Sequence, residues 1–302
     1  MTRIMSVVGA TVALVLVPAL PSNAATLKAG QSYVFAERGA TTISLVLTQN
    51  GATLAIRQSD KYFPYEFTLG NTGTRATVPI QWGLPSSAVI KFQVTVVSGT
   101  LVFKGVVLDA GALVPLAQAQ ALPVLTVYGD SIGDGWNSGG PINDSDGYAD
   151  QLAGLLGHRL SSQSVPGMSA YCWGQYHVQD VVRSRPSIVI EAFGTNDVAG
   201  DFWGCKPTQD QFRSALDSMF SQLLARLGSV PIYVSAILPR QDIDVTSWNS
   251  IIQTEAGTYG LPYIDPSGSL VLWSDYSDGV HPNLSGHTHL ATFWSGVVTT
   301  AT

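Results

Sequence analysis

The sequence predicts an α/β domain whose parallel sheet is covered by helices on both faces, preceded by a smaller all-β sandwich. From residue 26 to about residue 118, short apolar or β-branched runs alternate with turn residues, a spacing typical of sandwiches. From Val124 onward, strand-like runs alternate with segments whose apolar residues recur at helical spacing, which favours parallel strands joined by helices. The chain has 302 residues, 45% of them hydrophobic, so it is long enough to build both cores.

The N-terminus carries the pattern of a secretory signal peptide. Arg3 gives a positive start, an apolar run spans residues 4–20, and the small residues Ser22-Asn23-Ala24 form a cleavage pattern. The alternative is a membrane anchor. The length of the apolar run argues against it, because a spanning helix needs roughly 20 residues and the run is shorter. We therefore expect a signal peptide at 1–24, a secreted or periplasmic mature protein, and no membrane association after cleavage.

The stretch 26–118 is predicted to form the β-sandwich domain. Its seven expected strands cover 32–36, 42–47, 52–57, 65–69, 76–81, 88–97 and 101–108, with turns that include 49–51 and 98–99. The stretch contains no histidine and its acidic residues are isolated, so we expect no catalysis there. Most of its aromatic residues alternate as core residues do, but Tyr62, Phe63 and Trp82 depart from this pattern and could form a sugar-stacking patch.

Residues 110–123 are predicted to link this domain to a second domain at 122–302. The second domain begins with a buried strand from Val124. Further strands are expected near 188–193, 230–238 and 261–264, and helices within 147–158, 208–227, 243–258 and 284–298. The alternation of strands and helices along the chain predicts a parallel sheet with helices on both faces.

Ser131 follows the first of these strands and is a candidate nucleophile, because loops at the carboxyl ends of strands bind ligands in α/β sheets. A serine hydroxyl needs a base, a group that orients the base, and donors for an oxyanion. His281 can supply the base, and Asp278 lies three residues before it. Gly167 follows Ser164-Val165-Pro166, another expected short strand, and Asn196 follows the strand expected near 188–193.

Four blocks in this order resemble the SGNH hydrolases, the GDSL-type esterases and lipases. They are Gly129-Asp130-Ser131-Ile132, Gly167, Gly194-Thr195-Asn196-Asp197 and Asp278-Gly279-Val280-His281. The resemblance covers roughly residues 122–300, and its one departure is Ile132 where the family name has leucine. It implies a three-layer, flavodoxin-like α/β/α domain.

The resemblance also implies a role for each site residue. Ser131 would attack an ester carbonyl, and His281 would act as general base and then general acid. Asp278 would orient His281, although Asp275 is a rival for that role. The N–H groups of Ser131 and Gly167 and the side-chain amide of Asn196 would form the oxyanion hole.

The layout of a β-sandwich, here expected to be jelly-roll-like, before such a domain resembles the two-domain carbohydrate esterases that remove acetyl groups from polysaccharides. Trp136, Trp173 and Trp203 lie beside small or polar residues in the catalytic blocks, a mixture suited to a sugar ring and its hydroxyls. We therefore expect an esterase that deacetylates carbohydrates, as acetylxylan esterases do. The alternatives are a GDSL-type lipase or acylhydrolase acting on lipid esters, and a carbohydrate-binding protein with an inactive hydrolase domain.

The cysteines, the histidines and the net charge limit the cofactors and partners that the chain is expected to bind. In an exported protein, Cys172 and Cys205 are expected to form a disulfide, the alternative being two buried thiols. Two cysteines and five dispersed histidines form no ligand pattern, so neither a metal nor another cofactor is expected. The net charge is −6, with lysine and arginine scattered, which disfavours nucleic-acid binding. The expected partner is an ester substrate, an acetylated saccharide in particular.

Overall fold

The computed structural model describes residues 25–40, 42–58, 66–69, 76–81, 89–136 and 146–300. The signal peptide predicted at 1–24, and the aromatic residues Tyr62, Phe63 and Trp82, lie outside this part. Within it, every helix is too short or too polar to cross a membrane.

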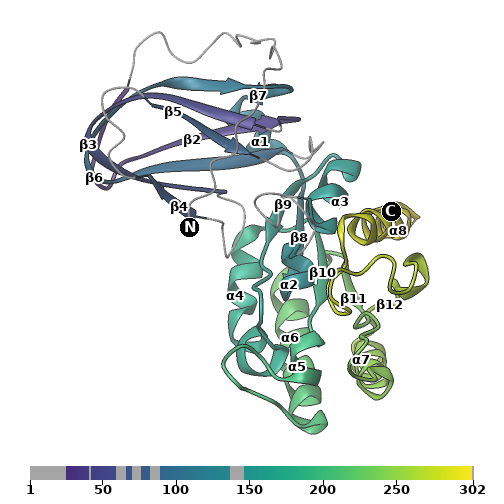
Figure 1. Cartoon of the computed structure of the whole chain (residues 1–302). Helices are drawn as coiled ribbons and strands as arrows, with labels where there is room; N and C mark the ends of the chain where they lie inside the picture. Colours follow the sequence, from purple (N-terminus) through teal and green to yellow (C-terminus); the bar gives the residue numbers. More distant parts are fainter. Residues whose placement is uncertain are drawn as a thin grey trace.

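The N-terminal part is an antiparallel β domain, drawn in purple and blue in Figure 1. Its strands are β1 (Ala25–Lys28), β2 (Ser32–Arg38), β3 (Thr42–Gln58), β4 (Glu66–Leu69), β5 (Ala76–Gln81), β6 (Ile90–Leu108) and β7 (Ala112–Val114). The long strands β3 and β6 pair along their length. The first half of β3 pairs with β5 and its second half with β4, while β6 pairs first with β2 and then with β1. The predicted all-β domain is confirmed.

The turns predicted at 49–51 and 98–99 are wrong, because β3 and β6 continue through both places. Asn50 pairs with Thr100 and Thr53 pairs with Ser98, with register shifts on either side of Thr53. Gly99 has a φ of 79°. Such irregularities insert an extra residue and bend a strand without ending it. Gly99 therefore lies at an irregularity inside a strand and not at a turn between two strands.

The segment predicted as a linker is ordered. It contains β7, which pairs with β2, and α1 (Leu116–Ala121). Ala119 of α1 is buried against Ala36 and Val89. Val89 also forms an isolated bridge with Arg159, so the two sheets are joined by backbone contact as well as by the chain. The boundaries at 118 and 122 stay a prediction.

The C-terminal part contains a parallel five-stranded sheet in the order β12-β11-β10-β8-β9. The strands are β8 (Val124–Gly129), β9 (Arg159–Ser162), β10 (Ile188–Ala192), β11 (Ile232–Ser235) and β12 (Tyr263–Ile264). Numbered along this domain, the order is 2-1-3-4-5, which is that of flavodoxin-like folds. Every residue of β8 and β11 is buried, as expected for strands covered on both faces.

Helices cover both faces of the parallel sheet, as predicted. On one face, Val127 and Ile190 pack with α3 (Tyr148–Leu156) and α8 (Leu284–Thr300). On the other face, Val189 packs with α4 (Gln175–Ser184), α6 (Gln209–Leu227) and α7 (Thr246–Thr258). The period-two alternation of strand side chains produces these two apolar layers. This three-layer domain is drawn in teal to yellow in Figure 1.

Candidate active site

Ser131 is the first residue of α2 (Ser131–Asp134), directly after β8. The side chain of Asp130 caps this short helix by accepting a hydrogen bond of 3.0 Å from the N–H of Ile132. A Cβ at Gly129 would lie 2.8 Å from the backbone oxygen of Ala192 on β10, so the strand end requires glycine. This tight strand-to-helix turn holds Ser131 at the carboxyl edge of the sheet.

A continuous chain of hydrogen bonds joins Ser131, His281 and Asp278. The Ser131 Oγ lies 2.9 Å from the His281 Nε2, and the His281 Nδ1 lies 2.8 Å from the Asp278 Oδ2. The other carboxylate oxygen of Asp278 accepts the N–H groups of His281 at 2.8 Å and Val280 at 3.0 Å. In this geometry His281 can accept the hydroxyl proton of Ser131.

Asp278, and not its rival Asp275, lies against His281. Asp275 is buried and accepts hydrogen bonds from the His289 ring and from the N–H of Val271, each at 2.7 Å. Burial alone would raise the pKa of Asp278, but hydrogen bonds from His281 and Val280 outweigh it, so this pKa lies below its ordinary value. Asp278 is therefore a carboxylate at neutral pH, and it can accept the Nδ1–H of the His281 ring.

The loops that carry Gly167 and Asn196 meet beside Ser131. Gly167 has a φ of 78°, and a Cβ there would lie 2.8 Å from the Phe202 Cβ. Asn196, in α5 (Thr195–Ala199), donates one amide hydrogen to the Met168 oxygen at 2.9 Å. Within the described part of the chain, the N–H groups of Ser131 and Gly167 donate to no other group. These two N–H groups and the second amide hydrogen of Asn196 remain for a ligand.

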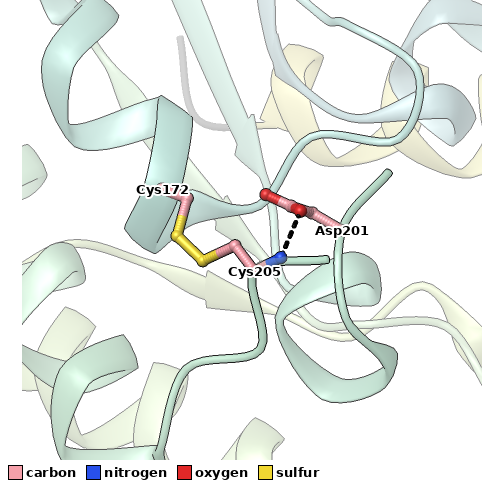
Figure 2. A group of neighbouring side chains, drawn as sticks. All are labelled: Cys172, Asp201 and Cys205. Atoms are coloured by element: carbon pink, nitrogen blue, oxygen red, sulfur yellow. Dashed lines mark hydrogen bonds between the residues drawn. A yellow bond between two sulfur atoms is a disulfide. The ribbon is translucent and has the colours of Figure 1, made fainter. Parts of the chain in front are cut away.

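A disulfide joins Cys172 to Cys205, as predicted (Figure 2). Cys172 lies in η1 (Ala170–Gly174), just after the Gly167 loop, and Cys205 lies after α5. Beside the disulfide, Asp201 accepts the N–H of Cys205 at 2.7 Å and that of Trp203 at 3.0 Å. The three side chains Cys172, Asp201 and Cys205 approach within 4.8 Å, but the bridge leaves neither sulfur as the thiolate that a metal binds. This cluster fastens the two loops together.

Three buried carboxyl groups lie beneath these loops. Burial raises the pKa of Glu191 to about 8, that of Asp197 to about 7 and that of Asp130 to about 6. Asp197 accepts the N–H groups of Ala170 at 2.8 Å and Tyr171 at 3.1 Å, which ties α5 to η1. Glu191 accepts the N–H of Phe193 at 3.1 Å. A glutamate inside an otherwise apolar strand was the visible signal for this cluster in the sequence.

We expect the free energy of unfolding to fall as the pH rises from about 5 to about 8. A raised carboxyl pKa means that the folded chain keeps a proton that the unfolded chain has already lost. For Glu191 this holds between its ordinary value of 4.5 and about 8. The folded state is therefore not destabilised by Glu191 below pH 4.5. The free energy of unfolding falls as the pH rises through this range, and the loss is complete above about pH 8.

Urea unfolding at several pH values measures this slope. Glu191→Gln should make the slope shallower, because the amide cannot ionise, while Asp197 and Asp130 keep part of it. The control Glu255→Gln changes a carboxylate on α7 that pairs with Arg213, and it should keep the slope. Stability that rises with pH over the same range would contradict the account.

The three predicted tryptophans differ in exposure. Trp136 is exposed and Trp203 is 72% exposed. Trp173 is partly buried against the α4–α6 core and stacks on His177 at 3.9 Å between ring centroids, so its contacts are with the protein. Phe202, which is not among the predicted substrate-binding residues, is 80% exposed and packs edge-on against Trp203. Its place beside Trp203, just before a bridged cysteine, was the signal that could have found it.

The model of the GDSL-like lipase/acylhydrolase family matches residues 127–289. This match covers more than half of the chain and contains all four blocks, so the chain belongs to this family. Membership supports a carboxylic ester hydrolase. No curated protein sequence matches the chain.

Solved structures of carbohydrate esterases share the two-part fold. A family two carbohydrate esterase from Clostridium thermocellum, in complex with cellohexaose, has a TM-score of 0.55 and 15% identity, covering 92% of this chain and 95% of that one. An acetyl xylan esterase (Est2A) from the rumen bacterium Butyrivibrio proteoclasticus has a TM-score of 0.52 and 16% identity, covering 90% and 89%. At such identities the likeness concerns the fold: a β domain followed by an SGNH hydrolase domain.

Proposed function

We propose that this protein is a secreted serine esterase that hydrolyses carboxylic esters through an acyl-enzyme on Ser131, with acetylated saccharides as substrates. The observation that carries the proposal is the chain of hydrogen bonds from Ser131 through His281 to Asp278. Beside it, the N–H groups of Ser131 and Gly167 and the amide of Asn196 can receive an oxyanion. This set of groups is what acyl transfer by a serine requires.

The first half of the reaction forms the acyl-enzyme. The Ser131 Oγ attacks the ester carbonyl carbon while the His281 Nε2 takes the hydroxyl proton. The carbonyl oxygen becomes an oxyanion and accepts hydrogen bonds from Ser131, Gly167 and Asn196. Collapse of the tetrahedral intermediate breaks the bond to the alcohol oxygen, which receives the proton from His281. Asp278 stabilises the positive imidazolium between these two transfers.

The second half releases the acid. His281 takes a proton from a water molecule, whose oxygen attacks the acyl carbon, and the same donors bind the second oxyanion. Cleavage of the bond to the Ser131 Oγ returns the proton to Ser131 and frees the carboxylic acid. His281 and Asp278 thus act in the same way in both halves, whereas Ser131 is the nucleophile in the first half and the leaving group in the second.

Exposed aromatic side chains near the catalytic blocks favour a saccharide substrate. The exposed rings of Trp136, Phe202 and Trp203 offer the flat apolar faces on which sugars stack. The acetyl xylan esterase and the cellohexaose complex among the similar structures support the same substrate class.

A lipid ester is the second candidate, and one observation favours it. Val271, Leu272 and Trp273 form an exposed apolar run shortly before Asp278, and Trp273 has a φ of 65°, a backbone conformation that bulky side chains rarely adopt. Such a run could contact a long acyl chain or a lipid surface.

Export is part of the proposal. The signal peptide pattern at 1–24 and the disulfide between Cys172 and Cys205 support it, since disulfides persist in oxidising compartments.

We expect kcat/KM to be highest for acetate and to fall along a series of aryl esters from acetate to decanoate, with acetate released from acetylated xylo-oligosaccharides. Two variants separate the candidates. Trp203→Ala should raise KM for the oligosaccharide about tenfold, equivalent to about 1.4 kcal/mol of lost stacking, and leave aryl acetate unchanged. Leu272→Ala should change neither. The lipid candidate would replace the saccharide one if three results came together. The kcat/KM would climb beyond eight carbons, it would fall in Leu272→Ala, and the acetylated oligosaccharides would release no acetate.

A further inference from the structure

The loop after β11, residues 236–242, contacts both halves of the candidate site; we call it the bridging loop. Its Arg240 side chain is 8% exposed. The Arg240 Nη1 donates a hydrogen bond of 3.0 Å to the Thr195 backbone oxygen. That oxygen belongs to the peptide group that leads into Asn196. The bridging loop therefore reaches the backbone directly beside the amide that is proposed to bind the oxyanion.

The guanidinium is held in a fixed plane from its other side. Its Nε and Nη2 donate to the two carboxylate oxygens of Asp242, at 2.9 Å and 2.7 Å. A bidentate pair of this kind fixes orientation as well as distance. A lysine at this position could not make the same three contacts, because its ammonium is a single point donor on a flexible stem.

The rest of the bridging loop is also anchored. The N–H of Ile237 donates to the Asn249 side chain at 2.8 Å, and the Asn249 amide returns a bond of 3.0 Å to the Ile237 oxygen. The Ile237 side chain packs against Gly194, where a Cβ would approach it to 2.6 Å. The N–H of Gln241 donates to the Gly279 oxygen at 2.9 Å, within the segment that carries Asp278 and His281.

By contrast, the helix that carries Asn196 has little rigidity of its own. α5 has five residues and begins after Gly194, whose φ is 126°. A helix of this length closes too few hydrogen bonds to be stable alone. Contacts from outside must therefore set the direction of the Asn196 amide. Among the described residues they include the bond to the Met168 oxygen, the two bonds that Asp197 accepts from η1, and the bond from Arg240 to the peptide group before Asn196.

We propose that Arg240 is a positioning residue: it holds the Thr195–Asn196 peptide so that the free amide hydrogen of Asn196 points at the developing oxyanion. The inference rests on the proposed function, since it needs Asn196 as an oxyanion donor. A donor misplaced by a fraction of an ångström stabilises the transition state less, while substrate binding is hardly affected. Loss of Arg240 should therefore lower kcat and leave KM nearly unchanged.

A double-mutant cycle between Arg240→Met and Asn196→Ala tests this. Arg240→Met keeps the apolar stem and removes the donors, and we expect it to lower kcat on aryl acetate about 10- to 100-fold. In the Asn196→Ala background the same change should cost less than about threefold, because residues that act through one another are not additive. The control Arg213→Met removes an arginine that pairs with Asp210 and Glu255, and it should keep full kcat.

Two results would overturn the inference alone: an unchanged kcat in Arg240→Met, or the same fold loss in both backgrounds. If Asn196→Ala by itself left kcat unchanged, the proposed oxyanion hole would fail and the inference with it. Melting temperatures of all variants separate positioning from unfolding. If Arg240→Met does not fold, Arg240→Lys replaces it in the same cycle. The loss of kcat should then be smaller, and it should again disappear in the Asn196→Ala background.

Discussion

Replacing Ser131 with alanine is expected to lower kcat for aryl acetate by about 10⁴-fold or more, the range seen when a serine nucleophile is removed. The reason is geometric: within the described residues, the Ser131 Oγ is the hydroxyl that lies on the His281 ring, at 2.9 Å. Without it no acyl-enzyme forms, and only the weaker stabilisation of direct attack by water remains.

The fold should survive this change. The Ser131 side chain is small, and among the described residues its hydroxyl bonds to the partly exposed His281, so the melting temperature should move little. Ser277→Ala is the matched control, because the Ser277 hydroxyl bonds to the His281 backbone oxygen at 3.1 Å and not to its ring. Retention of more than about a tenth of the activity by Ser131→Ala would remove Ser131 from the mechanism.

Replacing Asn196 with alanine is expected to lower kcat by about 10²- to 10³-fold, the loss typical of one oxyanion-hole donor. KM should change little, because the interaction is stronger with the oxyanion than with the carbonyl oxygen of the substrate. The Asn196 amide has two hydrogens, one of which is donated to the Met168 oxygen, so the other carries the predicted effect.

Asn196→Asp distinguishes a donor from a spacer. It keeps the shape of the side chain but replaces the donor with a carboxylate, which would repel an oxyanion. We expect it to be at least as damaging as Asn196→Ala in steady-state assays of kcat. If Asn196→Asp were nearly as active as the unmodified protein, Asn196 would have no role as an oxyanion donor.

The position of the candidate site was predictable because the fold brings strand ends together. Ser131 and Asn196 follow β8 and β10, which are neighbours in the sheet. β9 pairs with the other side of β8, so the strand order reverses at β8. Parallel strands have their carboxyl ends at one edge, so blocks that each follow a strand had to converge there. Asp278 lies only three residues before His281, so one short loop is enough to bring the two side chains into contact.

Other features depend on contacts that no local pattern records. Gly51 and Gly99 carry the signal of a turn, and only the pairing of β3 with β6 makes these places bends inside strands. Trp173 and Trp203 have similar sequence surroundings, yet one packs on His177 and the other is exposed. Arg240 belongs to no motif, and its contact with Thr195 spans 45 residues of sequence.

Covalent labelling with an aryl phosphonate ester tests the central claim most directly, because such a reagent reacts with a serine only when a base activates it. Peptide mapping by mass spectrometry should find one adduct per chain, on Ser131, with loss of esterase activity in step with labelling. His281→Ala should react far more slowly. An unlabelled Ser131 in protein that still hydrolyses aryl acetate, or a single adduct on another residue, would contradict the account.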